Sequence, residues 1–441
     1  MHTILRAAAC AGLLLALSPI VHAQSSPEIQ VGARTVVDYE FDWGRDGIYC
    51  PNCNFGEGNN RLAFIDKDGN VWLARISVDT GNFWPTDGKG KLVDTNAITA
   101  GTIGNGPEWM ALTQASAVVY DRFLDGKPHT FQNGCVGFAH PSSDRSWVGG
   151  CMPDTKGYTL PIGTGIVGDQ YPMVSYQNFS RTVTNVYWRL MQDGAEVHEA
   201  LSGSDQTGVT RRWVAGTHKL LLTAPAPPDA TGTVYRQVFL YSTDDETLEQ
   251  LTFEPTNKTS AFMWQAPEYD NKYVFFVRVG VTEVDVYRYL PTPGGSPSWQ
   301  VINRIYSDPA YPYFYSAEPF VYKGKSWVFF SISAEQQGHN ISGTSQIAMS
   351  GIEPTEIGDS TFRVLTSDVP DARARRDPEY YITANGPYLY YNRYIVLAPG
   401  VAQPEGVFRI DTGLGPLAAK PPAAKVGRAE TSVARKTRSA R

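Results

Sequence analysis

Four glutamates recur in a short phrase that places a proline beside the glutamate and an aromatic residue within two positions of it. An apolar run of strand length follows each phrase. Carboxylates at repeated positions meet when the repeats pack around one axis. Crowded carboxylates push each other's pKa values apart until one can act as acid and another as base. The predicted acid/base residues are Glu108, Glu268, Glu318 and Glu379.

Cationic, acidic and aromatic side chains also lie at or beside this repeated phrase. Guanidinium groups could hold an anionic sugar through bidentate hydrogen bonds, and aromatic rings could stack on sugar faces. For a lyase, Tyr380 would act as base while Arg376 neutralises the carboxylate of a uronic acid. The predicted substrate-binding residues are Arg211, Arg212, Arg375, Arg376, Asp377, Tyr380, Trp109 and Trp264.

A structural interpretation stands beside this one. A glutamate at a repeated position could hydrogen-bond the backbone of a neighbouring unit, and a large aromatic side chain could belong to the core between sheets. The sequence predicts that several carboxylates and guanidiniums meet on one face. It leaves open whether that face cleaves a polysaccharide, binds one, or only stabilises the repeat.

The elements that would position these residues are short strands in repeated units. Apolar runs are separated by polar turns, which is typical of up-and-down antiparallel sheets. Seven units begin near residues 51, 107, 172, 212, 267, 318 and 378. One such sheet cannot bury both faces alone, so the units must stack, and radial stacking gives a β-propeller. We predict an all-β fold with seven blades; six would also fit, because the units near 172 and 212 are the least regular.

The early strand Arg34–Phe41 has no unit of its own in this scheme, and the last unit ends after three strands. Pairing the two would close the ring and remove exposed sheet edges. We therefore predict that this N-terminal strand completes the last blade.

The stretches Gln237–Ser242, Leu248–Pro255 and Ala266–Tyr269 resemble the WD40-like repeat of TolB-type propellers. That repeat runs from a strand through "QLT" to a proline-containing turn and an apolar strand. The present chain lacks the usual SPDG turn and places glutamate after proline in several units. The resemblance implies the propeller fold, and it implies a periplasmic protein-interaction platform as one candidate function.

The first 23 residues have the features of a secretory signal peptide: Arg6, the short apolar core Ala7–Leu17, and Val21-His22-Ala23 before the expected cleavage site. We predict one propeller domain over residues 24–415 and a disordered basic tail over 416–441. No later run is apolar enough to span a membrane. These features predict a secreted or periplasmic protein.

Five cysteines are present, and Cys10 would leave with the signal peptide. An even number of cysteines in an exported chain favours disulfides. Because each pair lies within one local stretch, we expect Cys50–Cys53 and Cys135–Cys151. A redox or zinc role for Cys50 and Cys53 has less support, since no thioredoxin-like pattern or further ligands surround them.

The formal net charge of −6 gives no indication of nucleic-acid binding. We predict a monomer without a metal or other cofactor, although oxygen ligands in a carboxylate-rich channel would also suit Ca²⁺. The predicted ligand is a polysaccharide or another polar molecule at the channel mouth. The sequence favours a glycosidase or polysaccharide lyase, and the rivals are a non-catalytic protein-interaction platform and a lectin-like module. Substrate identity does not follow from the sequence.

Overall fold

The computed structural model describes residues 27–42, 60–85, 90–99, 106–111, 116–152 without 143 and 145, 155–159, 164–165, 173–178, 186–190, 196–200, 210–214, 217–292, 294–336, 343–353, 361–367, 372–398 and 401–416. Over these residues the chain contains strands, turns and short 3₁₀ segments such as η2 (Phe131–Asn133) and η3 (Pro267–Tyr269), and no α-helix. The fold is all-β, as predicted.

The described strands form seven antiparallel sheets, each made mainly of consecutive strands. The first three sheets contain β2 (Val36–Phe41), β3 (Arg61–Asp66), β4 (Val71–Ile76), β5 (Phe83–Trp84) and β6 (Lys91–Asp94); β7 (Glu108–Ala111), β8 (Ser116–Phe123), β9 (Gly134–Pro141) and β10 (Trp147–Cys151); and β11 (Tyr158–Thr159), β12 (Thr164–Gly165), β13 (Met173–Asn178), β14 (Val186–Leu190) and β15 (Glu196–Ala200). The next three contain β16 (Thr210–Trp213), β17 (Lys219–Pro225), β18 (Arg236–Ser242) and β19 (Leu248–Gln250); β20 (Lys258–Ala266), β21 (Lys272–Val279), β22 (Glu283–Leu290) and β23 (Ser298–Tyr306); and β24 (Tyr313–Tyr322), β25 (Lys325–Ser333), β26 (Ser345–Gly351) and β27 (Arg363–Val364). The last contains β28 (Arg373–Thr383), β29 (Gly386–Ala398), β30 (Val401–Asp411) and β1 (Ile29–Gln30).

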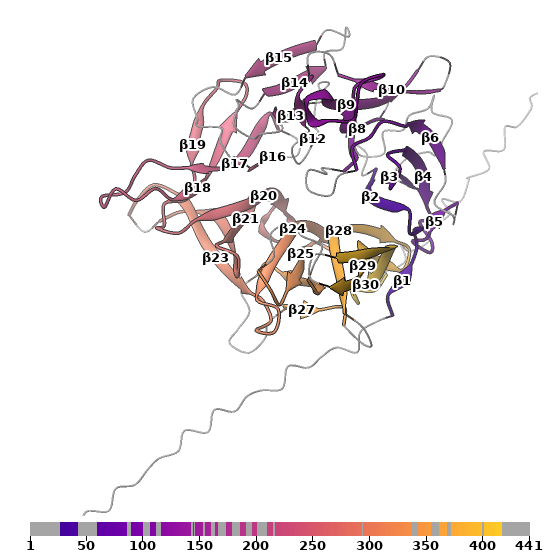
Figure 1. Ribbon diagram of the computed structural model, residues 1–441. Coiled ribbons are helices and arrows are strands. Elements are labelled where there is room, and N and C mark those ends of the chain that lie inside the picture. Colours follow the sequence, from indigo (N-terminus) through magenta and orange to yellow (C-terminus); the bar gives the residue numbers. More distant parts are fainter. Residues whose placement is uncertain are drawn as a thin grey trace, which may run out of the picture.

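The sheets are arranged around a common centre, and Figure 1 shows β2, β12, β16, β20, β24 and β28 nearest to it. Later strands of each sheet lie toward the rim. This radial arrangement is a β-propeller, which confirms the predicted fold class. The described residues supply seven sheets, and the blade count of the complete chain stays a prediction.

Apolar side chains fill the spaces between neighbouring sheets. Phe41 of the first sheet packs edge-on against Tyr390 of the last, with ring centroids 4.9 Å apart. Phe276 and Phe330 belong to one cluster that joins the fifth and sixth sheets. Because each sheet is covered on both faces, β21 and β25 are nearly continuous apolar runs and do not alternate with polar residues.

The ring is closed by a different N-terminal strand from the one that the sequence predicted. Arg34–Phe41 was expected to pair with the last unit, but β2 pairs with β3 and is the first strand of the first sheet. The closing strand is β1, whose residues Ile29 and Gln30 pair with β30. The Gln30 side-chain amide adds a 2.8 Å hydrogen bond to the Glu405 carbonyl. The prediction that an N-terminal strand completes the last sheet is confirmed, but it was assigned to the wrong strand, because a two-residue strand is too short for periodicity to reveal.

Cys135 and Cys151 lie on β9 and β10 with their Cα atoms 5.8 Å apart, and the structure joins their sulfur atoms. This separation fits a disulfide. Cys50 and Cys53 lie outside the described residues. The oxidation state of all four cysteines, and the export that would favour it, stay predictions.

Candidate functional site: a carboxyl cluster at the centre of the ring

Six acidic side chains on the innermost strands come together at the centre of the propeller. Two are on β2, one on β7, one on β24 and two on β28, so four sheets contribute. The central carboxyl cluster consists of Asp38, Glu40, Glu108, Glu318, Asp377 and Glu379. Electrostatic interactions link all four strands, since the charges of Glu40, Glu108 and Glu318 each act on Glu379. Three of the four predicted acid/base glutamates therefore belong to one group.

The register of the sheets explains why Glu318 and Glu379 meet. Each lies four residues before the last paired residue of its strand. Each also follows a β-bulge, where the residue two positions earlier has a positive φ of 45° at Ser316 or 52° at Asp377. A bulge bends the strand and re-aims the side chains beside it. Two neighbouring sheets thus present carboxylates from the same level of the ring.

The fifth sheet has the same bulge, with a φ of 54° at Ser260, but Phe262 occupies the position equivalent to Glu318 and Glu379. Glu268, which the sequence aligned with them, lies farther along the chain, in η3 at the hairpin after β20. The structure therefore does not bring Glu268 into the central carboxyl cluster.

Glu268 instead fastens the fifth sheet to the sixth. Its carboxylate accepts hydrogen bonds from the backbone N–H of Ser326 at 2.8 Å and from the Ser326 hydroxyl at 2.9 Å. The indole N–H of Trp264 donates to the same hydroxyl at 3.0 Å. Trp264 is buried, at 8% exposure, so both residues have contacts that explain their presence structurally.

Asp38 and Asp377 form a carboxyl–carboxyl pair within the cluster. Burial, followed by the charge of Asp377 and a hydrogen bond to it, raises the pKa of Asp38 well above its usual range. Although Asp377 is exposed, desolvation by the surrounding sheets, followed by the charge of Glu318, raises its pKa to about 6, while the hydrogen bond from Asp38 opposes that rise. The Tyr39 hydroxyl also donates to the Asp377 carbonyl at 3.2 Å. At neutral pH this pair favours a protonated Asp38 that donates to an ionised Asp377.

The remaining glutamates show the same effect of burial and like charge. Burial raises the pKa of Glu108 to about 8, with the charges of Glu318 and Asp377 adding to the rise and Arg212 opposing it. Burial and neighbouring carboxylates also raise the pKa values of Glu40 and Glu379 well above their usual range. These groups therefore favour the neutral acid at pH 7.

Arg212 on β16 supplies the main positive charge of the cluster. Its Nη2 lies 2.6 Å from Glu318 Oε1, and its guanidinium lies over the Phe262 ring, 4.7 Å from the centroid. Burial disfavours the charged guanidinium, but Glu318 and Glu108 outweigh burial and raise the pKa of Arg212. The side chains of Arg212 and Glu318 keep 25% and 18% exposure, so solvent reaches this ion pair. Glu318 therefore differs from the other carboxyl groups of the cluster in having a described ion-pair partner.

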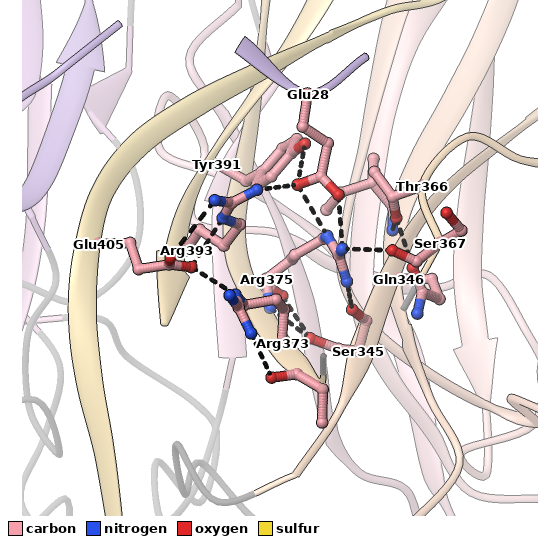
Figure 2. A network of polar contacts seen from close by, with 12 residues as sticks. Glu28, Ser345, Gln346, Thr366, Ser367, Arg373, Arg375, Tyr391, Arg393 and Glu405 are labelled. Atoms are coloured by element: carbon pink, nitrogen blue, oxygen red, sulfur yellow. Dashed lines mark hydrogen bonds and ion pairs between the residues drawn. The ribbon is translucent and has the colours of Figure 1, made fainter. Parts of the chain in front are cut away.

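The structure places Arg375 away from this cluster, in a polar network at the ring closure (Figure 2). Its guanidinium donates to the Glu28 carboxylate and to the carbonyls of Ser345 at 2.7 Å and Ser367 at 2.9 Å. Arg375 is only 1% exposed, so its predicted role in substrate binding gains no support from its position. Glu28 also accepts from Arg393 at 3.1 Å, which anchors the segment before β1.

Of the other predicted residues, two border the cluster, one contacts the backbone of a cluster residue, and the side chain of one is not described. Arg376 lies next to Asp377, whose charge acts on it. Tyr380 stacks on Phe320 with centroids 5.2 Å apart, and burial and the charge of Glu379 raise its pKa. Trp109 is buried and donates its indole N–H to the Glu40 carbonyl at 3.0 Å. The side chain of Arg211 lies outside the described part of the structure.

The sequence interpretation missed Asp38 and Glu40. Both lie on β2, two residues apart, so their side chains share one face of the strand. The signal was present in the stretch Val36–Phe41, where two acids alternate with apolar residues. It was overlooked because that strand had been assigned to the ring closure and not to the centre.

Among the described residues, no group of three or more histidine, cysteine, aspartate or glutamate side chains could hold a metal ion. In the same part of the chain, no helix is long and apolar enough to cross a membrane.

No protein-family model matches the chain, and no curated protein matches it. Among solved structures, it is similar to an oligogalacturonate lyase from Vibrio parahaemolyticus, at 11% identity and TM-score 0.49, over 87% of this chain and 92% of that one. It is similar to the Cps50 (Swd1) β-propeller domain of Myceliophteria thermophila, at 10% identity and TM-score 0.48, over 89% and 100% of the two chains. A putative TolB from Agrobacterium tumefaciens matches at 14% identity and TM-score 0.32, over 56% and 78%. At these identities and TM-scores, the similarities carry no argument about function.

Proposed function

We propose that the protein binds a polysaccharide at the centre of the propeller and cleaves its glycosidic bonds by acid–base chemistry. One observation carries the proposal: Glu318, ion-paired with Arg212, stands among carboxyl groups whose pKa values are raised. Glycoside hydrolysis needs one protonated and one ionised carboxyl group beside the same bond. A cluster whose carboxyl groups have different pKa values can meet that requirement, because some are protonated at a pH at which others are ionised.

In the proposed reaction, Glu108 is the first candidate for the acid. Its pKa of about 8 keeps it protonated at neutral pH. It gives its proton to the glycosidic oxygen as the bond to the anomeric carbon breaks. Glu318 accepts a proton from the attacking water, whose oxygen forms the new bond to that carbon. Glu379, which is 7% exposed and also favours the neutral acid, is the second candidate for the proton donor.

The predicted signal peptide agrees with this proposal, because polysaccharides are substrates found outside the cytoplasm.

The test is cleavage of a panel of neutral and acidic polysaccharides by the full chain, with reducing ends measured over time. Glu318→Gln keeps the shape of the side chain but removes its charge, so we expect a loss of about 10²-fold or more in rate with binding retained. The matched control is Glu249→Gln, an exposed glutamate on β19, which should leave cleavage unchanged.

Two results would contradict the proposal. Binding of a glycan without cleavage, unaffected by Glu318→Gln, would instead support a lectin-like module. Failure to bind any glycan of the panel would favour a protein partner and the platform function.

A further inference from the structure

Arg278, near the end of β21, is a half-buried cation whose fixed contacts are all neutral. Its Nε–H donates to the Thr259 hydroxyl at 3.1 Å, and its Nη1 donates to the Phe314 carbonyl at 2.8 Å. Burial lowers the pKa of this guanidinium, and within the described residues no carboxylate charge opposes that effect. One edge of the guanidinium is therefore fixed by the protein, and its charge has no described counter-ion.

The absence of a described counter-ion distinguishes Arg278 from two arginines on the innermost strands. Arg212 is paired with Glu318, and Arg375 is paired with Glu28. A cation that is partly desolvated without a counter-ion is costly in free energy, and an anionic ligand would offset that cost.

The sheet register pairs Arg278 with Thr259, level with the residues that precede the bulges of the central strands. The residues immediately before the three equivalent bulges are Thr259 on β20, Tyr315 on β24 and Arg376 on β28. Arg278 contacts the first, and its guanidinium carbon lies 5.9 Å from the ring centroid of the second. The charge of Tyr315 also acts on Arg376. Three neighbouring sheets thus contribute Arg278, Tyr315 and Arg376, with both arginines interacting electrostatically with the tyrosine.

The adjoining acids do not rule out an anion here. The residue after Arg376 is Asp377, the first member of the carboxyl cluster on β28. Asp377 is ionised at neutral pH and lies against Arg376. Burial and mutual repulsion raise the pKa values of Asp38, Glu40 and Glu379, so these three favour the neutral form. Neutral carboxyl groups donate hydrogen bonds to sugar hydroxyls without repelling a negative charge nearby.

We propose that Arg278 and Arg376 bind the carboxylate of an acidic sugar, which makes uronic-acid-containing polysaccharides the substrate class of the central site. This inference rests on the proposed function, in which a glycan occupies the carboxyl cluster. A guanidinium fork matches a carboxylate through two parallel hydrogen bonds. Because Thr259 and Phe314 already hold Arg278, little side-chain freedom is lost when the ligand binds.

The test compares binding of uronic-acid oligosaccharides with their carboxyl-reduced counterparts by titration calorimetry on the full chain. A third set, neutral oligosaccharides carrying sulfate, distinguishes a carboxylate from anions in general. We expect wild type to bind the uronic acids about tenfold or more tightly than the reduced forms. Arg278→Gln should remove most of that preference while leaving affinity for the reduced forms nearly unchanged.

Two variants control for charge and for folding. Lys272→Gln removes a positive charge from the other end of the same strand and should leave the preference intact. Arg278→Lys keeps the charge but not the fork, so it should retain only part of the preference. Thermal melting of each variant shows whether the fold is kept.

Equal binding of acidic and reduced forms by wild type would overturn this inference and leave the proposed function standing. An equal loss for both forms in Arg278→Gln would also overturn it. Equal binding of sulfated and uronic-acid forms would contradict the assignment to carboxylates. Failure to bind every member of the panel would contradict both proposals.

Discussion

Two charged regions of this propeller use the same residue types in opposite ways. At the ring closure, the carboxylates of Glu28 and Glu405 lie between arginines, and Arg393 contacts both of them (Figure 2). At the centre, six carboxyl groups face one another, and Arg212 forms the described ion pair among them. We call the first region balanced because each of its carboxylates is paired with arginines, and the second unbalanced because its carboxyl groups outnumber the arginines beside them.

The difference appears in the direction of the pKa shifts. Burial opposes ionisation of Glu28, but hydrogen bonds and charge from Arg375 and Arg393 outweigh burial and lower its pKa. Burial raises the pKa of Glu379, and neighbouring carboxylates raise it further. Arginine partners keep the buried carboxylate of Glu28 ionised, whereas burial and like charge push Glu379 toward the neutral acid, a form that can donate a proton.

The largest expected effect comes from breaking the balanced region. Arg375→Met removes a fully buried cation and leaves the carbonyls of Ser345 and Ser367 without its hydrogen bonds. We expect a loss of about 3–5 kcal/mol in the free energy of unfolding, measured by denaturant titration. Because the pKa of Glu28 is lowered, the stabilisation from its ionised form exists above its usual pKa and is lost as pH falls below it. The difference from wild type should therefore shrink in acid.

Substituting a carboxyl group in the unbalanced region should raise the free energy of unfolding. Glu108→Gln replaces a carboxyl group whose pKa rises from 4.5 to about 8 on folding. A raised pKa means that folding is favoured below pH 4.5 and loses stability as pH rises toward 8, because the unfolded chain ionises first. The variant should thus be more stable than wild type by about 1–3 kcal/mol at pH 7 and equal to it at pH 4. Thermal melts across this pH range would check it, and a destabilised variant at pH 7 would contradict it.

A smaller effect separates structural from central glutamates. Glu268→Gln weakens the two hydrogen bonds that Ser326 donates. We expect a loss of about 1 kcal/mol in stability and no change in glycan binding or cleavage. A loss of cleavage comparable to that of Glu318→Gln would show that Glu268 acts in the reaction, against the position that the structure gives it.

How far the sequence could predict the site depends on strand register. Glu318 and Glu379 were predictable because their repeated phrase also coincides in the sheets. Glu268 shares the phrase, yet it lies at the hairpin while Phe262 takes the equivalent place, because the bulge at Ser260 is invisible in the sequence.

The sequence analysis did not predict the central residues of β2 for a different reason. The closing strand β1 has two residues, and so short a strand shows no periodicity. Arg34–Phe41 was assigned to closure in its place, which removed Asp38 and Glu40 from the predicted centre. Arg278 lies on the second strand of its sheet, where the repeated phrase gives no signal at all.

The central claim is that the unbalanced carboxyl groups perform acid–base chemistry on a glycan. The most direct measurement is the initial rate of reducing-end release by wild type, Glu318→Gln and Glu249→Gln on whichever polysaccharide of the panel wild type binds most tightly. The account predicts a loss of about 10²-fold or more in Glu318→Gln and none in the control. Equal rates in all three proteins, with folding intact, would contradict it.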